Sequence, residues 1–437
     1  MFRFILADLR RHWAGVVAVT LIVALATALG VVVTLQERAL RLGSARAADA
    51  FDLVIGAPGS ETQLVLSSVF LQAAPLPLMP GSVLAGLVAD PRVAWAAPVG
   101  FGDFVEGSPI VGTTAALVEG VGGVSEGRGF EHIGDAVIGA SVGMRPGDRF
   151  HPQHGQVGGP GGVHTEASYH VVGRLKPTGT PWDRAVLVPI QAVWNLHRHE
   201  EHEEHGGQGD SEGQGASEAQ PGQAEPHSFF APAPASDEDG HDALGFDAAV
   251  DPAAVADAGA PGLPAIVVKP ASIADAYKLR QQYRSERTVA VFPGEVLTRL
   301  YGTLGDVRFI LSMVATGAQA LVGAAILLVV TVHILQRRRQ IGALRALGAP
   351  RHAIFAIVWS EAFAIIGVGL CLGFAVGYGA ARALSTAFTA ASGITLPVTF
   401  EPADLFRLGL LLLVTGIIAS LPALLAYRQP PASALRG

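Results

Sequence analysis

The sequence has almost no cysteine, because Cys371 is the single one among 437 residues. One thiol can form neither an intrachain disulfide nor a zinc site built from cysteines. Charged residues are also scarce, since Asp, Glu, Lys and Arg make up 15% of the chain while hydrophobic residues make up 50%. This balance favours a membrane protein over a soluble one.

No phosphate-binding loop of the form G-x-x-x-x-G-K-[ST] is present, and no Ser-His-Asp or paired-carboxylate arrangement stands out. We therefore expect no enzymatic activity in this chain, so any ATP hydrolysis would belong to a separate subunit. Lys and Arg are missing from 199 to 268, a stretch of 70 residues that holds 15 acids. Such acidity repels nucleic acid, and no DNA or RNA partner is expected.

Four apolar segments are long enough to cross a bilayer, which takes about 20 residues. The first could be a signal peptide, but its apolar run is too long and lacks a cleavage site, so we predict an uncleaved anchor. Arginines precede the first span, lie between the second and third, and follow the fourth. Positive charge in short loops marks the cytoplasmic side, which places both termini inside.

The predicted fold class is a membrane protein with four transmembrane helices and a large α/β domain outside the membrane between spans one and two. The predicted parts are 1–35 (N-terminus and first span), 36–306 (outer domain), 307–336 (second span), 337–351 (cytoplasmic segment), 352–382 (third span), 383–403 (short outer loop), 404–427 (fourth span) and 428–437 (cytoplasmic tail).

The outer domain shows short strand-like runs separated by Gly and Pro pairs. We predict strands at 51–57, 93–99, 108–114, 136–142, 169–175, 184–190 and 264–270, and helices at 61–71 and 271–285. Ser272 is the candidate cap of the second helix. A low-complexity acidic stretch at about 197–260 cannot build a core, and we predict a disordered insertion there.

Histidines gather at the start of that insertion, in the sequence WNLHRHEEHEEHGG. Imidazole and carboxylate ligands suit zinc, and helical spacing would place three of the histidines on one side. The candidate zinc ligands are His197, His199, His202, His205, Glu201 and Glu204. The alternative is a solvated, charged helix end without a metal. Other histidines near a Gly-rich loop could add ligands, namely His151, His154, His164 and His170.

Two features of the third span concern packing and charge. Gly369, Gly373 and Gly377 repeat every four residues, a spacing that lets another helix approach closely. The approaching helix could belong to a second copy or to the same chain. Glu361 lies early in this span, where a carboxylate is costly unless it is paired or wetted. A structural, hydrogen-bonded role and a proton path are the alternatives for Glu361.

The stretch RRRQIGALRALGAPRHAIFAIVWSEA, which begins at Arg337, resembles the segment after the second span of FtsX-like, MacB-type (type VII, mechanotransmission) ABC permeases. The resemblance implies that Ile341 to Leu347 form a coupling helix on an ATP-binding subunit and that Gly348 ends it. The implied coupling residues are Ile341, Leu344, Arg345, Leu347 and Gly348, and Glu361 matches the family's acid in span three. The end of the chain, from Pro422, and parts of the outer domain also resemble this family.

What the resemblance implies is an inner-membrane permease with a periplasmic MacB-like core domain, paired with a second permease copy and with ATP-binding subunits. ATP would bind to those subunits, and this chain itself would carry no cofactor beyond loosely bound zinc. The His-rich insertion departs from the macrolide and lipoprotein members and suggests a zinc-linked subgroup. A periplasmic metal-binding or carrier protein would then be a further partner, alongside membrane lipid.

Four functions stay open at this point. The first is an ATP-driven permease acting on a metal-linked periplasmic substrate. The second is extraction or efflux of a lipoprotein or another amphiphile, with the histidines incidental. The third is regulation of a cell-wall hydrolase by the outer domain, and the fourth is a metal-binding anchor without an ATPase. The coupling stretch argues against the fourth.

Overall fold

The computed structural model describes residues 9–303 and 350–428, apart from 12, 73, 155–161 and 197–243, together with a few single residues between 309 and 320. The chain divides into two compact units. We call residues 1–44, 300–391 and 395–437 the helical unit, and residues 45–299 with 392–394 the α/β unit.

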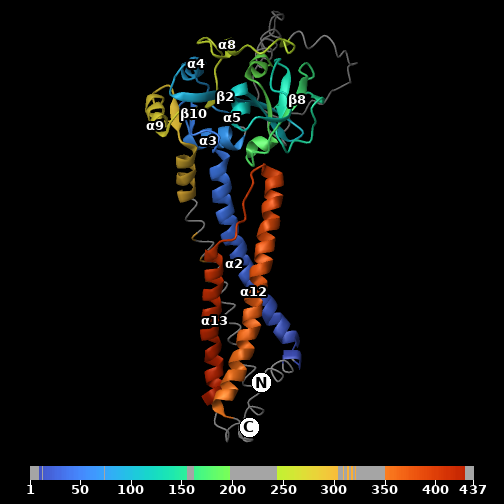
Figure 1. Ribbon diagram of the computed structural model, residues 1–437, viewed down its shortest axis with the longest axis vertical. Coiled ribbons are helices and arrows are strands. Elements are labelled where there is room, and N and C mark those ends of the chain that lie inside the picture. The colour runs from blue at the N-terminus through green and yellow to red at the C-terminus, as the bar shows by residue number, and fades with distance from the viewer. Residues whose placement is uncertain are drawn as a thin grey trace, which may run out of the picture. The chain divides into compact units, whose positions relative to one another are not determined.

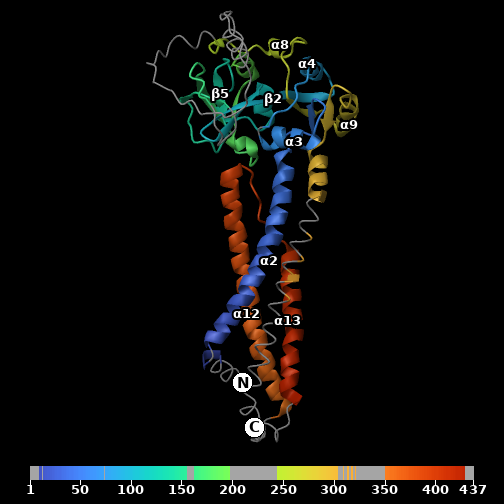
Figure 2. The same ribbon diagram turned by 180° about the vertical axis from the view of Figure 1, so that it is seen from behind.

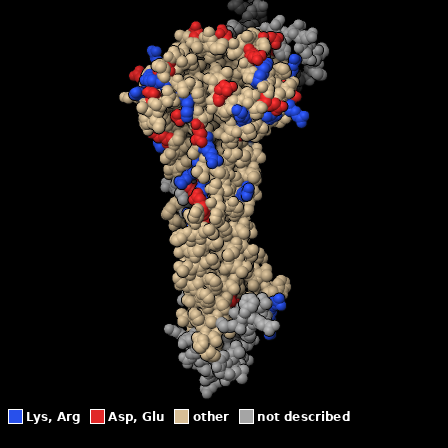
Figure 3. Space-filling model, in the orientation of Figure 1, with Lys and Arg blue, Asp and Glu red and all other residues tan. Residues whose placement is uncertain are grey.

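The helical unit contains three described helices that are long and apolar enough to cross a membrane. They are α2 (Trp13–Ala47), α12 (Arg351–Ser392) and α13 (Pro402–Arg428), and they run side by side in both views (Figures 1 and 2). Side chains on the visible face of these helices are almost all uncharged over their middle part (Figure 3). An apolar outer face is what lipid requires, because hydrocarbon solvates no charge.

The α2 helix continues past the predicted end of the first span at residue 35. Its sequence from Gln36 to Ala47 is rich in Ala, Leu and Arg, which favour helix, and contains one glycine. The hydroxyl of Ser44 lies 2.6 Å from that of Tyr301, on the helical stretch 293–303 that precedes the second span. The segments that lead out of the first span and into the second therefore meet.

The α/β unit is built on one mixed sheet, mostly antiparallel, in the order β11-β1-β10-β2-β3-β9-β5-β8-β4. Its strands are β1 (Leu53–Gly56), β2 (Val93–Val105), β3 (Ser108–Thr113), β4 (Val124–Gly127), β5 (Asp135–Ile138), β6 (Arg149–Phe150), β7 (Gln153–His154), β8 (Tyr169–Leu175), β9 (Val186–Pro189), β10 (Ala265–Pro270) and β11 (Val289–Val291). Parallel pairing occurs between β3 and β9 and between β5 and β8. The strands β6 and β7 lie off the main path, on β8 and β2.

Short helices pack on this sheet. They are α3 (Glu61–Phe70), α4 (Ser82–Val88), α5 (Ala115–Gly120), α8 (Pro252–Val255) and α9 (Ile273–Gln282). The Ser60 hydroxyl accepts a hydrogen bond from the Gln63 N–H at the start of α3, and Ser272 does the same for Asp275 at the start of α9. Each cap satisfies a backbone donor that would otherwise lack a partner in the first turn. The cap predicted at Ser272 is present.

Apolar residues of the strands join one large buried cluster in the α/β unit, and β1, β5 and β9 are buried along their whole length. The largest fully buried side chains include Trp182, Tyr169, Phe51 and Phe246. Tyr169 lies between Phe150 and Phe246, with ring centroids 5.4 and 5.0 Å away. Burial of aromatic rings contributes a large share of core stability because each removes a large apolar area from water.

The predicted end of the disordered insertion, at about residue 260, is wrong. Residues 244–260 are part of the fold, because Leu244, Phe246 and Val255 join the core. The Gly134 N–H donates to the Phe246 carbonyl at 2.8 Å, and Asn195 donates to the Leu244 carbonyl at 3.0 Å. The apolar residues of this segment stand singly among acids and glycines, so its composition resembles that of the low-complexity stretch before it. The remainder, 197–243, lies outside the described residues.

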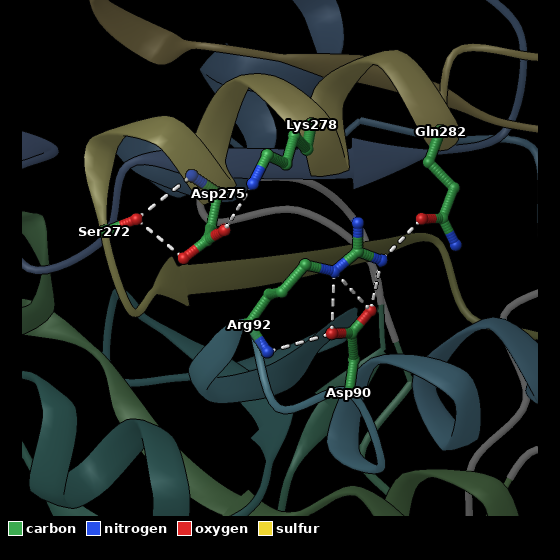
Figure 4. A network of polar contacts seen from close by, with 6 residues as sticks. All are labelled: Asp90, Arg92, Ser272, Asp275, Lys278 and Gln282. Carbon is green, nitrogen blue, oxygen red and sulfur yellow. Dashed lines mark hydrogen bonds and ion pairs between the residues drawn. The ribbon is translucent and has the colours of Figure 1, made fainter.

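A polar network fixes α9 to the turn before β2 (Figure 4). The Arg92 guanidinium bonds both carboxylate oxygens of Asp90 and donates to Gln282 of α9 at 2.6 Å. The side-chain and backbone N–H groups of Arg92 hold the pKa of Asp90 below its ordinary value. Asp90 therefore stays ionised at neutral pH, and the contact to α9 persists.

Candidate functional site

The glycine stripe of α12 lies against α2 of the same chain. Gly369, Gly373 and Gly377 recur every four residues, so they share one helix face, and all three are buried. A Cβ atom added to Gly373 would lie 2.4 Å from the Ala24 carbonyl oxygen, and one added to Gly377 would lie 2.8 Å from that of Ala28. The two backbones thus approach as closely as glycine allows, and the described contact is within one chain.

A charged clamp joins α2 to the start of α13. The Arg38 guanidinium donates to both carboxylate oxygens of Asp404, at 2.9 and 2.8 Å, and lies 3.5 Å from Glu401. The side chains of Arg38 and Asp404 are 16% and 6% exposed, so the pair is largely removed from water. Breaking one member of such a pair leaves a buried charge without compensation, which costs about 3–5 kcal/mol. Gln36 adds a hydrogen bond of 2.7 Å to the Ala381 carbonyl of α12.

The helices α12 and α13 meet through an aromatic pair. Trp359 stacks on Phe363, with ring centroids 5.0 Å apart, and its indole N–H donates to the Gly416 carbonyl at 2.9 Å. Glu361 lies on α12 between these two aromatic residues and is half-buried. The candidate acid therefore sits beside a packed helix contact.

The coupling and metal candidates lie outside the described residues. These are Ile341, Leu344, Arg345, Leu347 and Gly348 in the coupling stretch, and His197, His199, Glu201, His202, Glu204 and His205 in the His-rich run. The third span is described from its first residue. It begins at Arg351, directly after Pro350, and the Ala353 N–H donates to the Pro350 carbonyl at 3.0 Å.

Sequence reasoning missed an apolar cavity of about 320 Å³ in the α/β unit. The side chains that line it include Leu84 and Val88 of α4, Trp95 of β2, Ile190 after β9 and Val255 of α8. Cavities of this size with apolar walls take small apolar or amphiphilic ligands. The cavity forms between segments far apart in the chain, so no local pattern marks it.

Comparison with known proteins bears on the helical unit. Residues 312–432 match the family described as FtsX-like permease C-terminal. The C-terminal part of the chain belongs to this family. The matched FtsX-like segment contains α12, α13 and the stretch 337–351. None of the curated proteins matches the chain.

Two solved structures show a distant similarity to this chain. The periplasmic region of MacB from Actinobacillus actinomycetemcomitans has 9% identity and a TM-score of 0.30, over 58% of this chain and 95% of that one. The extracellular domain of the noncanonic ABC-type transporter YknZ from Gram-positive bacteria has 12% identity and a TM-score of 0.25, over 55% and 98%.

Proposed function

We propose that this chain is the permease subunit of an ABC transporter and passes ATP-driven motion from a separate ATP-binding subunit to its α/β unit. The observation that carries the proposal is the family match over 312–432, because it includes the stretch 337–351 that resembles a coupling helix. The ATP-binding subunit and a second copy of this chain are the proposed partners.

The route of the motion would be α2 and the helical stretch 293–303. A helix is stiff along its axis because every backbone hydrogen bond lies nearly parallel to it. The α2 helix runs without interruption from Trp13 to Ala47, and α12 and α13 are attached to it by the glycine stripe and by Arg38. A push on the segment before Arg351 would therefore move α2 as well as α12.

The deciding experiment is co-purification of the ATP-binding subunit with the full chain, followed by an assay of ATP hydrolysis in the complex. We expect a stable complex whose ATPase activity depends on this chain. An ATP-binding subunit that neither associates with the chain nor changes its activity would contradict the proposal.

The proposed orientation places both termini in the cytoplasm and the α/β unit outside the inner membrane. It follows from the arginines that flank the spans. A Ser217→Cys variant in a Cys371→Ala background should react with a membrane-impermeant maleimide once the outer membrane is permeabilised. Ser217→Cys that is labelled only after inner-membrane lysis would place the unit on the opposite side.

We further propose that the substrate is metal-linked and that the His-rich run binds zinc loosely. The proposed ligands are His197, His199, His202 and His205, with Glu201 or Glu204 assisting. Few ligands in so polar a stretch can be held rigid by packing, which makes the binding exchangeable. Zinc would also leave as the pH falls through the histidine range, because protons compete for imidazole.

A variant with all four of these histidines replaced by Ser tests this metal binding. We expect it to fold as the parent does and to lose the weak zinc equivalents seen by calorimetric titration of the full chain at neutral pH. A variant with Ser211, Ser217, Ser228 and Ser236 replaced by Ala is the matched control within the same region. If the variant without the four histidines takes up as much weakly bound zinc as the parent, the His-rich run does not bind zinc.

The apolar cavity favours a second candidate function, the extraction or efflux of an amphiphile. Its lining by Leu84, Trp95 and Val255 offers contact to an acyl or ring moiety and few polar partners. Mass spectrometry of material extracted from the purified chain would identify such a ligand. A chain that carries zinc and no amphiphile would speak against this alternative.

A further inference from the structure

Three side chains with metal-binding atoms, Asp103, His154 and His164, meet in the α/β unit. Asp103 of β2 pairs directly with His154 of β7. The backbone N–H of His154 donates to the Gly162 carbonyl, and the backbone N–H of His164 donates to the Pro152 carbonyl, each at 2.9 Å. Residues directly opposite in an antiparallel pair point to the same face of the sheet, so the backbone register places Asp103 and His154 together.

The ligand atoms of this cluster lie slightly farther apart than those around a bound zinc ion. The Asp103 Oδ1 atom lies 3.4 Å from His154 Nδ1 and 3.8 Å from His164 Nε2. One ligand atom of each residue lies within 4.8 Å of the other two. Four-coordinate zinc with bonds of about 2.0–2.2 Å to nitrogen and oxygen keeps its ligand atoms about 3.3–3.6 Å apart. Small side-chain rotations would bring all three residues to that geometry.

Burial makes two of the ligands rigid and leaves the third accessible. The side chains of Asp103 and His164 are 3% and 11% exposed, whereas that of His154 is 51% exposed. A cation can therefore enter from the His154 side and reach a carboxylate that is almost fully removed from water. Burial, together with the charge of Asp103, raises the pKa of the nearby Tyr169.

Glu166 sets the orientation of the His164 ring. Its Oε1 atom lies 2.9 Å from His164 Nδ1, and the Ala167 N–H donates to the His164 carbonyl at 3.3 Å. With the Nδ1 proton donated to Glu166, the lone pair of His164 lies on Nε2, the atom that faces Asp103. Metal-ligating histidines usually donate their other ring N–H to a carboxylate or carbonyl in this way.

We propose that Asp103, His154 and His164 form a binding site for zinc or a similar divalent cation, with Glu166 as the residue that positions His164. Two imidazoles and one carboxylate are ligands that zinc accepts, and three protein ligands leave one position open for water or an exchanging group. The proposed site shares no residue with the His-rich run and does not depend on the transport function. Its ligands come from folded segments, so it binds more tightly than the His-rich run.

The test uses the full chain, purified without a polyhistidine tag, in which His197, His199, His202 and His205 are all replaced by Ser. This parent protein lacks the weak sites of the His-rich run. It is stripped of metal before it is titrated with Zn²⁺. We expect one bound equivalent. Co²⁺ in the same site should give the intense visible absorption of four-coordinate cobalt.

Four single variants in this parent decide the assignment. Asp103→Asn and His164→Ala should abolish the equivalent, whereas Glu166→Gln should weaken it about 10- to 100-fold. His154→Ala removes a half-exposed ligand, so it should fold and still lose tight binding. His170→Ala is the control, because His170 is an exposed histidine on β8, which pairs with β4, β5 and β6 and not with the strands of the cluster.

The unfolding temperature of each variant without metal shows whether its fold is intact. A parent that takes up no zinc would overturn the proposal. So would a folded His154→Ala variant that binds zinc as tightly as the parent, since the cluster would then be a hydrogen-bonded contact without a metal.

Discussion

Gly373→Leu is expected to separate α2 from α12 and to destabilise the helical unit. The first added atom, Cβ, would lie 2.4 Å from the Ala24 carbonyl oxygen and 2.6 Å from the Thr27 Cβ atom. Real Cβ atoms do not approach backbone this closely, and a carbonyl on a neighbouring helix cannot turn aside as a flexible side chain can. Overpacking of a tight contact costs about 1–3 kcal/mol, and a leucine here adds three further atoms to the clash.

Gly379→Leu on the same helix is the matched control, because a Cβ at Gly379 meets nothing within 4 Å. The measurement is thermal unfolding of the full chain in detergent, together with its yield in the membrane. We expect Gly373→Leu to lower both and Gly379→Leu to change neither. Equal unfolding temperatures for the two variants would show that the glycine stripe is not a required contact.

Leu344→Asp and Leu347→Asp are expected to abolish coupling while the chain remains in the membrane. Both residues are proposed to dock on the ATP-binding subunit, where an unpaired charge costs about 2–5 kcal/mol. That cost corresponds to roughly 30- to 4,000-fold weaker association. The measurement is the amount of ATP-binding subunit that co-purifies with each variant.

Ala346→Asp is the control for these two variants. In a helix, residue 346 lies about 160° from the mean direction of 341, 344 and 347, so its side chain would point away from the docking surface. It should retain the ATP-binding subunit. Normal association of both leucine variants would show that this stretch is not the docking element and would leave the family match without its proposed mechanism.

Local patterns predicted most of the secondary structure. The run YHVVGRL at 169–175 and the capped helix after Ser272 come from alternation and capping, which act over a few residues. The length of β2 was underestimated because Gly100 and Gly102 lower strand propensity, while pairing with β10 and β3 holds the strand through Val105. Tertiary pairing outweighs propensity here.

The contacts that carry function depend on register and topology, which no short pattern contains. Arg38 and Asp404 are 366 residues apart, and nothing near either residue marks the other as its partner. Asp103 and His154 face one another because β7 pairs with β2 in this register. A shift of β7 by one residue would turn the His154 side chain to the other face of the sheet. His154 and His164 are recognisable in the sequence as secondary candidate ligands, whereas nothing in the sequence around Asp103 marks it as their partner.

The order of the sheet has a consequence for how such a chain can change over evolution. The α/β unit opens with β1, whose two neighbours, β10 and β11, are the last strands of the unit. The chain therefore enters and leaves the unit through adjoining strands, and the Ser44–Tyr301 contact joins the two connecting helices. A domain whose first and last strands adjoin in this way can be replaced as a whole. It can be lengthened, trimmed or exchanged between relatives without a change in the order of the membrane-spanning helices, and a long acidic insertion can accumulate there without disturbing the membrane part.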